Sequence, residues 1–140
     1  MKNSVHIENR KVRHNYFILE TFISGIVLTG YDVKMIRQGK MSLNDTFCFF
    51  HNDELFIKNV TIVGDNGNVK NFKLLLKNKE LTKLKSKLDK GLTIVPYKVF
   101  SNEKGLIKVE LTLVRGKKLY DKRESLKEKE ISREIMRHIR

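Results

Sequence analysis

A run of cations around one aromatic residue, at residues 115–124, offers the plainest chemistry in this sequence. Each lysine or arginine in it can neutralise a phosphate, Tyr120 offers a flat face to a nucleobase, and Gly116 lets backbones approach closely. This combination favours RNA as the partner, although a solvated linker would have a similar composition. The cations are Arg115, Lys117, Lys118, Lys122 and Arg123.

A second set of cations precedes the first apolar segment, where it could fringe the mouth of a sheet or barrel. Arg10, Lys11 and Arg13 lie here beside Asn9 and His14. They are candidates for RNA contact, but a solvated N-terminal fringe with a surface imidazole would look the same. The first eight residues show no clear periodicity, and we expect them to be mobile.

Two further pairs of cations are candidates for phosphate contacts. Lys34 and Arg37 lie three residues apart in a segment with helical spacing that Gly39 should end. Lys73 and Lys77 follow a turn-like loop at 64–68. For these lysines and arginines a solvated surface is the alternative interpretation.

The sequence contains no pattern typical of catalysis or of a metal site. It has no phosphate-cradling glycine loop, no CxxC pair and no His/Glu spacing for a metal. We therefore expect a non-enzymatic protein without a cofactor. The single cysteine, Cys48, should be a small buried hydrophobic residue.

Size and charge favour one domain that binds nucleic acid. A chain of 140 residues is long enough for one core, and 29 lysines and arginines against 16 acids give a net charge of +13. No segment approaches the roughly 20 apolar residues of a membrane span, and the N-terminus lacks a signal peptide's apolar core. We expect a cytoplasmic, monomeric protein with no membrane partner.

The elements that must position these cations are mostly strands. The patterns predict a long strand over 16–28, bent at Gly25, and hairpins over 43–62 and 92–114. In the second hairpin one face should be buried and the other wet, with Pro96 at an edge or bulge.

The first hairpin is rich in aromatic residues. Exposed rings can serve as stacking platforms in RNA-binding sheets, but four cannot all be exposed in a soluble protein, so we expect most in the core. They are Phe47, Phe49, Phe50 and Phe56.

Two short helices complete the folded body. One covers 31–38. The other should be capped by Asn78, pack the leucines at 81, 84 and 88 onto the core, and end at Gly91.

Together these elements predict a mainly β protein with small helices, an antiparallel β-barrel of about six strands resembling the oligonucleotide-binding (OB) fold. The barrel domain should span residues 1–114, and residues 115–140 should form a basic tail, disordered or helical on binding. Isoleucines recur every four residues in the tail, at Ile131, Ile135 and Ile139.

Six motifs in order along residues 9–134 resemble those of the SsrA-binding protein family. They are Asn-Arg-Lys at 9–11, Gly-Ile-Val-Leu-Thr-Gly at 25–30 with Val-Lys at 33–34, Leu-Leu-Leu-Lys at 74–77, Gly-Leu-Thr-Ile-Val-Pro at 91–96, Lys-Val-Glu-Leu at 108–111 and the run at 115–124. The resemblance implies a barrel that holds the tRNA-like part of transfer-messenger RNA. It also implies a tail that enters the empty decoding site and messenger channel of stalled ribosomes.

The resemblance also implies roles for single residues. RNA contact by the barrel would fall on Asn9, Arg10, Lys11, Arg13 and His14. Ribosome contact by the tail would fall on Arg115, Gly116, Lys117, Lys118, Tyr120, Asp121, Lys122, Arg123 and Lys127.

The sequence departs from the family pattern at three places. Ile23-Ser24 stands where Glu-Ala is usual, Asp32 stands where Glu is usual, and the loop at 64–68 is shortened. The lysines near that loop could take over part of its electrostatic role.

Two other functions remain open from the sequence. A constitutive ribosome-associated protein could use the same barrel on ribosomal RNA and would sediment with all ribosomes. Alternatively, the isoleucine stripe could dock on an anionic membrane or an acidic partner.

Overall fold

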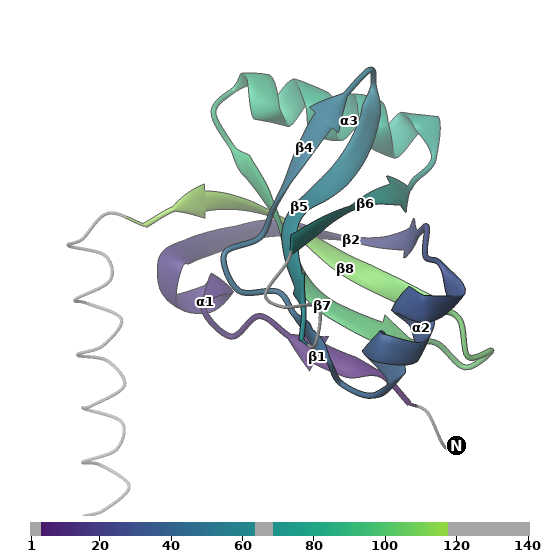
Figure 1. The fold of residues 1–140 in the computed structure, drawn as a ribbon. Helices are drawn as coiled ribbons and strands as arrows, with labels where there is room; N and C mark the ends of the chain where they lie inside the picture. Colours follow the sequence, from purple (N-terminus) through teal and green to yellow (C-terminus); the bar gives the residue numbers. More distant parts are fainter. Residues whose placement is uncertain (1–3, 64–68, 118–140) are drawn as a thin grey trace, which may run out of the picture.

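The computed structural model describes residues 4–63 and 69–117. Within them, eight strands form one antiparallel sheet in the order β1-β7-β8-β2-β6-β5-β3, with β4 also paired to β5. The sheet curls until β4 lies against β7, which makes a nearly closed barrel (Figure 1). The bounds are β1 His6–Glu8, α1 Val12–Asn15, β2 Tyr16–Ile26, α2 Gly30–Arg37, β3 Met41–Ser42, β4 Phe47–His51, β5 Glu54–Ile62, β6 Val69–Leu75, α3 Asn78–Asp89, β7 Thr93–Ser101 and β8 Ile107–Gly116.

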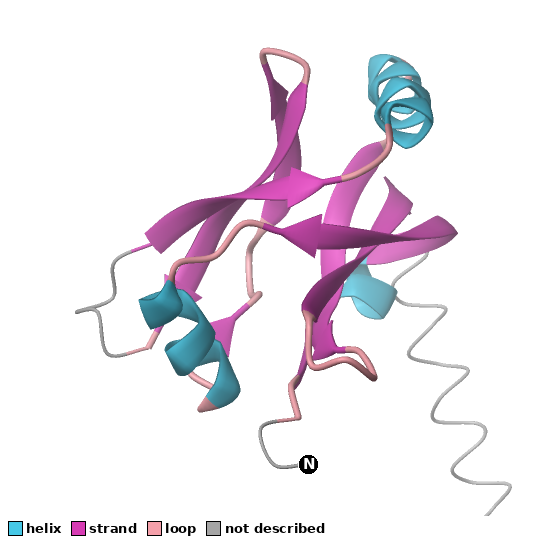
Figure 2. Ribbon diagram, turned by 90° about the vertical axis from the view of Figure 1, so that its right-hand side faces the viewer, coloured by secondary structure: helices cyan, strands magenta, loops and turns pink. Residues whose placement is uncertain are grey.

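The predicted antiparallel barrel with small helices at its edges is confirmed (Figure 2). Two short strands, β1 and β3, extend the six that were expected. The prediction of a mobile N-terminal segment is wrong for residues 6–8, because β1 pairs with β7 along its whole length. The predicted loop at 64–68 and the tail from residue 118 lie outside the described residues.

Strand β2 joins the two halves of the sheet. It pairs with β8 from its first residue to Gly25, and with β6 at Gly25 and Ile26. A Cβ on Gly25 would lie 3.2 Å from the Cβ of Leu75, so a glycine suits this close approach. Gly25 is therefore where the strand changes partner, while the irregular pairing lies between Ile18 and Glu20.

The main core fills the barrel beneath α3. Val109, Leu111 and Leu113 of β8 point into it, and Leu84 of α3 is completely buried. Burying one such leucine contributes about 2 kcal/mol. A second, smaller cluster beside α1 contains Val12, Val95, Tyr97 and Val114.

The alternation predicted for β8 holds only over the first part of the strand. Thr112, expected on the wet face, is buried like Val114, because the cluster around Val12 covers that end of the sheet. The Thr112 hydroxyl donates to the Val95 carbonyl at 2.8 Å, which satisfies the buried polar group. Pro96 lies beside a register shift between β7 and β8, as predicted.

The prediction that most hairpin phenylalanines lie in the core is wrong. Phe50 packs against the core, but the opposite face of the hairpin carries Phe47, Phe49 and Phe56. Cys48 is buried as predicted, and burial raises the pKa of its thiol.

Both predicted helices are present. α2 begins in a capping box, where the Asp32 amide donates to the Thr29 hydroxyl at 3.2 Å and the Thr29 amide donates to the Asp32 carboxylate at 3.0 Å. Gly39 follows the helix with a φ of +72°. The N-cap of α3 is Lys77 rather than the predicted Asn78. In the part of the chain that the structure describes, no helix is long and apolar enough to cross a membrane.

Candidate nucleic-acid interface

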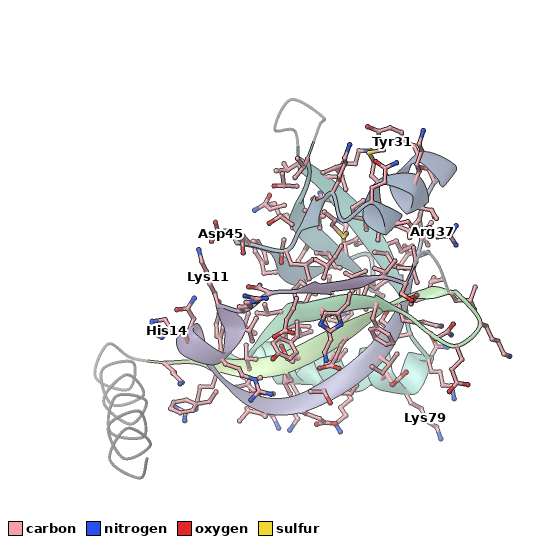
Figure 3. All side chains as sticks on the ribbon, turned by 90° about the horizontal axis from the view of Figure 1, so that it is seen from below. Lys11, His14, Tyr31, Arg37, Asp45 and Lys79 are labelled. Carbon is pink, nitrogen blue, oxygen red and sulfur yellow. The ribbon has the colours of Figure 1, made fainter. Side chains whose placement is uncertain are left out.

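The cations predicted to bind RNA fall into two groups in different parts of the barrel. Figure 3 shows Lys11 and His14 near each other at α1, and Arg37 well apart from them on α2. The α1 group comprises Arg10, Lys11, Arg13 and His14, and the α2–β6 group comprises Lys34, Arg37, Lys73 and Lys77. All of these side chains are exposed except those of His14 and Lys73, which are half-buried.

The α1 group adjoins the end of β8, where the predicted tail begins. β8 continues to Gly116, past the predicted boundary at residue 114, and the Lys117 amide donates to the Asn15 carbonyl at 2.8 Å. Arg115, Gly116 and Lys117 are therefore held against the barrel. The other predicted tail residues lie outside the described part of the chain, namely Lys118, Tyr120, Asp121, Lys122, Arg123 and Lys127.

Phe17 is a component of this end of the barrel that the sequence analysis missed. It pairs with Arg115 across the strands, and its ring centre lies 4.6 Å from the Arg115 guanidinium carbon and 5.0 Å from the Lys117 ammonium. The ring thus holds two cations together at the base of the tail. The sequence does show an aromatic residue shortly after the cations of the α1 group. It does not show that this residue pairs with Arg115 of β8, because that contact joins segments far apart in the chain.

Asn9 is not part of an exposed surface, contrary to expectation. Its side chain is 5% exposed and its amide nitrogen donates to the Leu43 carbonyl at 3.0 Å. Arg13 is exposed but engaged, because its Nε donates to the Tyr97 hydroxyl at 2.9 Å. That hydroxyl donates to Glu8 at 3.3 Å, and hydrogen bonds from His6 and then Tyr97 lower the pKa of the Glu8 carboxyl. Arg13 therefore fixes β1, α1 and β7 to one another.

The α2–β6 group borders an exposed apolar groove. Ile23 and Leu75, each 52% exposed, lie in it beside Gly25, where the backbone carries no side chain. Two hollows meet at this point. The cations that line them are Arg37, Lys73, Lys77 and Lys108. Such a groove can take the sugar or base face of RNA on its floor and phosphates on its rim.

Asp32, one of the departures from the family pattern, acts inside the protein. It is 4% exposed, and the Lys70 ammonium donates to its carboxylate at 3.1 Å. Burial alone would raise the pKa of Asp32, but hydrogen bonds from Thr29 and Lys70 outweigh burial, so the pKa lies below its ordinary value. The shorter side chain is therefore used for capping α2 and for holding Lys70.

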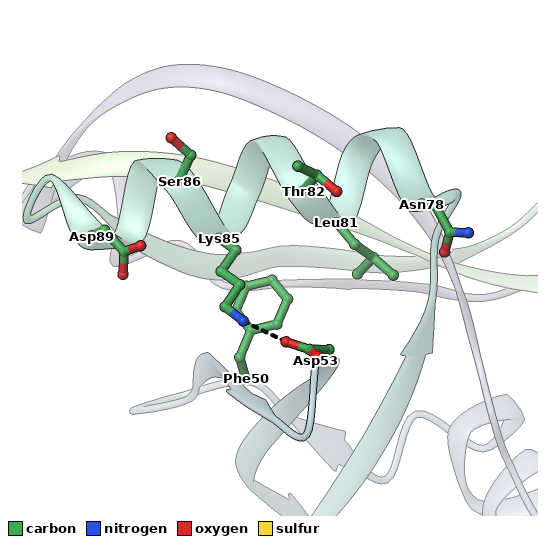
Figure 4. A pocket seen from close by; sticks show the side chains of 8 residues that line it. All are labelled: Phe50, Asp53, Asn78, Leu81, Thr82, Lys85, Ser86 and Asp89. Carbon is green, nitrogen blue, oxygen red and sulfur yellow. Dashed lines mark hydrogen bonds and ion pairs between the residues drawn. The ribbon is translucent and has the colours of Figure 1, made fainter.

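The hollow between α3 and the β4–β5 turn is a structural contact. Figure 4 shows the Lys85 ammonium and the Asp53 carboxylate joined across it, and Phe50 also lines the hollow. This ion pair lowers the pKa of Asp53 and raises that of Lys85. Lys83 donates to Glu20 at 2.6 Å. Two lysines of α3 thus fasten the helix to the sheet. Among the described residues no cluster of three or more metal-ligating side chains occurs.

Comparisons with known proteins agree with the resemblance and with this architecture. The SsrA-binding protein of Bacteroides thetaiotaomicron is 46% identical over 142 residues, covering 96% of this chain and 95% of its own, and that of Flavobacterium johnsoniae is 48% identical, covering 98% and 96%. A solved chain described as "tmRNA-SmpB: a journey to the center of the bacterial ribosome" has a TM-score of 0.65 and 40% identity, covering 86% of this chain and 94% of that chain. The family model described as SmpB protein matches residues 6–140, and the chain therefore belongs to the SmpB family.

Proposed function

We propose that this protein binds the tRNA-like part of transfer-messenger RNA and delivers it to stalled ribosomes. The observation that carries this proposal is the match to SsrA-binding proteins over nearly the whole chain, together with a fold shared with a chain solved in a tmRNA–SmpB study of the bacterial ribosome. The protein acts by binding, without a catalytic step or a cofactor. It works as a monomer in the cytoplasm, where ribosomes translate.

The groove beside the α2–β6 group is one RNA-binding surface. Its exposed apolar floor and glycine backbone suit close contact with the ribose and base edges of a folded RNA, and its lysines suit phosphates. Lys73 is already paired with Glu54 at 3.1 Å, so RNA would compete with that carboxylate for this ammonium.

The α1 group and the end of β8 form a second surface. Arg10 and Lys11 supply exposed charge there, and Arg115 and Lys117 lie over Phe17 nearby. This arrangement places the root of the tail beside barrel cations, so RNA held at α1 and RNA met by the tail would lie close together. The tail itself tests whether the messenger channel is occupied, because a basic segment cannot bind where messenger RNA already lies.

Recovery of the RNA that copurifies with the full-length protein tests the proposal directly. Transfer-messenger RNA should be enriched over transfer and ribosomal RNA. In gradients, the protein should move onto ribosomes when a message without a stop codon is expressed. Recovery of ribosomal RNA alone, with equal amounts of protein on all ribosomes, would instead establish the constitutive ribosome-associated function.

A further inference from the structure

The face of the β4–β5 hairpin that points away from α3 carries a row of aromatic rings with a lysine over them. Cross-strand pairing places Phe49 opposite Phe56, and Phe47 opposite Lys58. The rings of Phe49 and Phe56 stack with their centres 5.6 Å apart. The Lys58 ammonium lies 5.8 Å from the centre of the Phe47 ring and 5.9 Å from that of Phe49. We call these four residues the aromatic ladder.

The aromatic ladder is not part of the core. Phe50, the next residue along β4, lies beneath α3 (Figure 4). Successive side chains of a strand point to opposite faces, so Phe49 points away from the helix. Phe47 is 38% exposed, and Phe49 and Phe56 are half-buried against each other. Phe47 and Phe49 lie two residues apart on one strand, so both rings are presented on the same face of the hairpin.

The charge on this face favours an anionic partner. Among residues 4–63 and 69–117, Lys58 forms no ion pair, and its ammonium is held only over the rings. Glu54, at the end of the hairpin, is neutralised by Lys73. Flat rings beside an unpaired ammonium match the two parts of a single-stranded nucleic acid, its bases and its phosphates.

We propose that the aromatic ladder is a stacking platform for unpaired RNA bases, a surface that adjoins the groove at Lys73, the cross-strand partner of Phe56. Bases stack on Phe47 and Phe49, and the Lys58 ammonium leaves the ring faces to pair with a phosphate of the same strand. Phe56 supports the Phe49 ring from the neighbouring strand. Other RNA-binding sheets stack two or three bases on aromatic residues in the same manner.

A fluorescent residue in the aromatic ladder would report stacking directly. The chain contains no tryptophan, so Phe49→Trp gives the protein one tryptophan, placed in the ladder. The full-length variant is titrated with a single-stranded RNA of about ten nucleotides, and with the same strand annealed to its complement. The single strand should quench the emission, and the duplex, whose bases are covered, should not. Val63→Trp, at a site 55% exposed outside the ladder, is the control and should respond to neither.

Affinity for the same single strand separates stacking from charge. Phe49→Leu removes the ring but keeps an apolar side chain, so binding should weaken about fivefold or more with an unchanged salt dependence. Lys58→Gln should instead reduce the slope of log K against log salt by about 0.7. Phe49→Tyr keeps the ring and should bind like the unmodified protein.

Three results would overturn the proposal. One is tryptophan emission that the single strand does not change. The second is equal affinity of Phe49→Leu and Phe49→Tyr for the single strand. The third is an equal loss of single-strand and duplex binding in folded Phe49→Leu protein, because that would show an effect on the hairpin as a whole. Weaker single-strand binding with unchanged affinity for transfer-messenger RNA's tRNA-like part would support the ladder and leave the proposed function standing.

Discussion

Within the α1 group, the exposed cations differ in how freely they can meet a partner. Arg13 is held by the Tyr97 hydroxyl, with its guanidinium carbon 5.7 Å from the centre of the Tyr97 ring. The side chains of Arg10 and Lys11 are exposed and form no hydrogen bond or ion pair within the described residues. Arg10 and Lys11 can therefore each form an ion pair with a phosphate without breaking a contact in the protein.

Replacing Arg10 and Lys11 together with alanine should flatten the salt dependence of transfer-messenger RNA binding. With fewer phosphate contacts, binding releases fewer counterions from the RNA. The magnitude of the slope of log K against log salt should therefore fall by about one to two units. The matched control is Lys79→Ala with Lys90→Ala, both exposed on or after α3, with Lys79 far from Lys11 in Figure 3. An unchanged slope in the first variant would move the RNA surface away from α1.

At the scale of single elements, the capping box of α2 carries a titratable group. The hydrogen bonds from Thr29 and Lys70 stabilise the ionised carboxylate of Asp32, so the pKa in the folded protein is below the ordinary value of 3.8. A lowered carboxyl pKa stabilises the fold fully at pH values above the ordinary pKa. The stabilisation is lost as the pH falls through the pKa of the folded state.

Asp32→Asn should therefore lower the free energy of unfolding by about 1 kcal/mol at neutral pH, the usual size of a lost helix cap. The difference from the unmodified protein should shrink as the pH falls from 3.8 through the lower pKa of the folded state, because Asp32 is protonated in both states only below that pKa. Urea unfolding over this pH range measures it. Glu103→Gln, at an exposed turn residue, is the control. A difference that stays constant with pH would show that the carboxylate charge is not what matters.

Local patterns were sufficient for elements whose signals are contained in a few neighbouring residues. Gly39 marks the end of α2, and alternating side chains mark the second hairpin, so the sequence predicts both. The errors have a common cause in contacts between distant segments. Thr112 is buried because Val12 of α1 and its neighbours cover that end of β8. Phe49 faces outward because α3 covers the other side of the hairpin. Periodicity shows that a strand has two faces, but not what covers each of them.

The groove beside β6 predicts a difference between two pairs of lysines. Lys73 and Lys77 line it, whereas Lys85 and Lys87 lie on α3. Reversing the charge of the first pair to glutamate should weaken transfer-messenger RNA binding by about tenfold or more, because attraction to phosphates becomes repulsion. The second pair is matched, since each pair contains one lysine already bonded to a carboxylate. Equal losses, measured by filter binding at one salt concentration, would indicate only a diffuse positive field.

For the whole molecule, the sequence predicted a set of candidate cations but not how the fold groups them. Residues 10–14 and 115–117 are a hundred residues apart in the chain, and β2 pairing with β8 brings them together. Asn9 lies beside cations in the sequence, yet its side chain is buried and donates a hydrogen bond to the carbonyl of the distant Leu43. The root of the tail is thus built into the barrel, which changes where the two predicted activities can be separated.

A chain that ends after Lys117 should keep its fold and most of its affinity for transfer-messenger RNA, but should not support tagging on stalled ribosomes. Everything up to Lys117 is retained, including the hydrogen bond that the Lys117 amide donates to the Asn15 carbonyl and the cations over Phe17. What is removed is the remaining basic run, with the residues expected to contact ribosomal RNA around the empty decoding site.

A second truncation sharpens this test. Ending the chain after Val114 also removes the pairing of Arg115 with Phe17 and of Gly116 with Tyr16, so this variant should be less stable by about 1–2 kcal/mol. Full-length protein with alanine at Asp121, Lys122 and Arg123 should reproduce much of the tagging defect while keeping the stability of the unmodified chain. RNA binding, tagging and thermal unfolding are measured on the same preparations. If the chain ending at Lys117 were folded but bound transfer-messenger RNA as poorly as it supported tagging, the tail would belong to the surface that holds the RNA. The division of labour between barrel and tail would then be wrong.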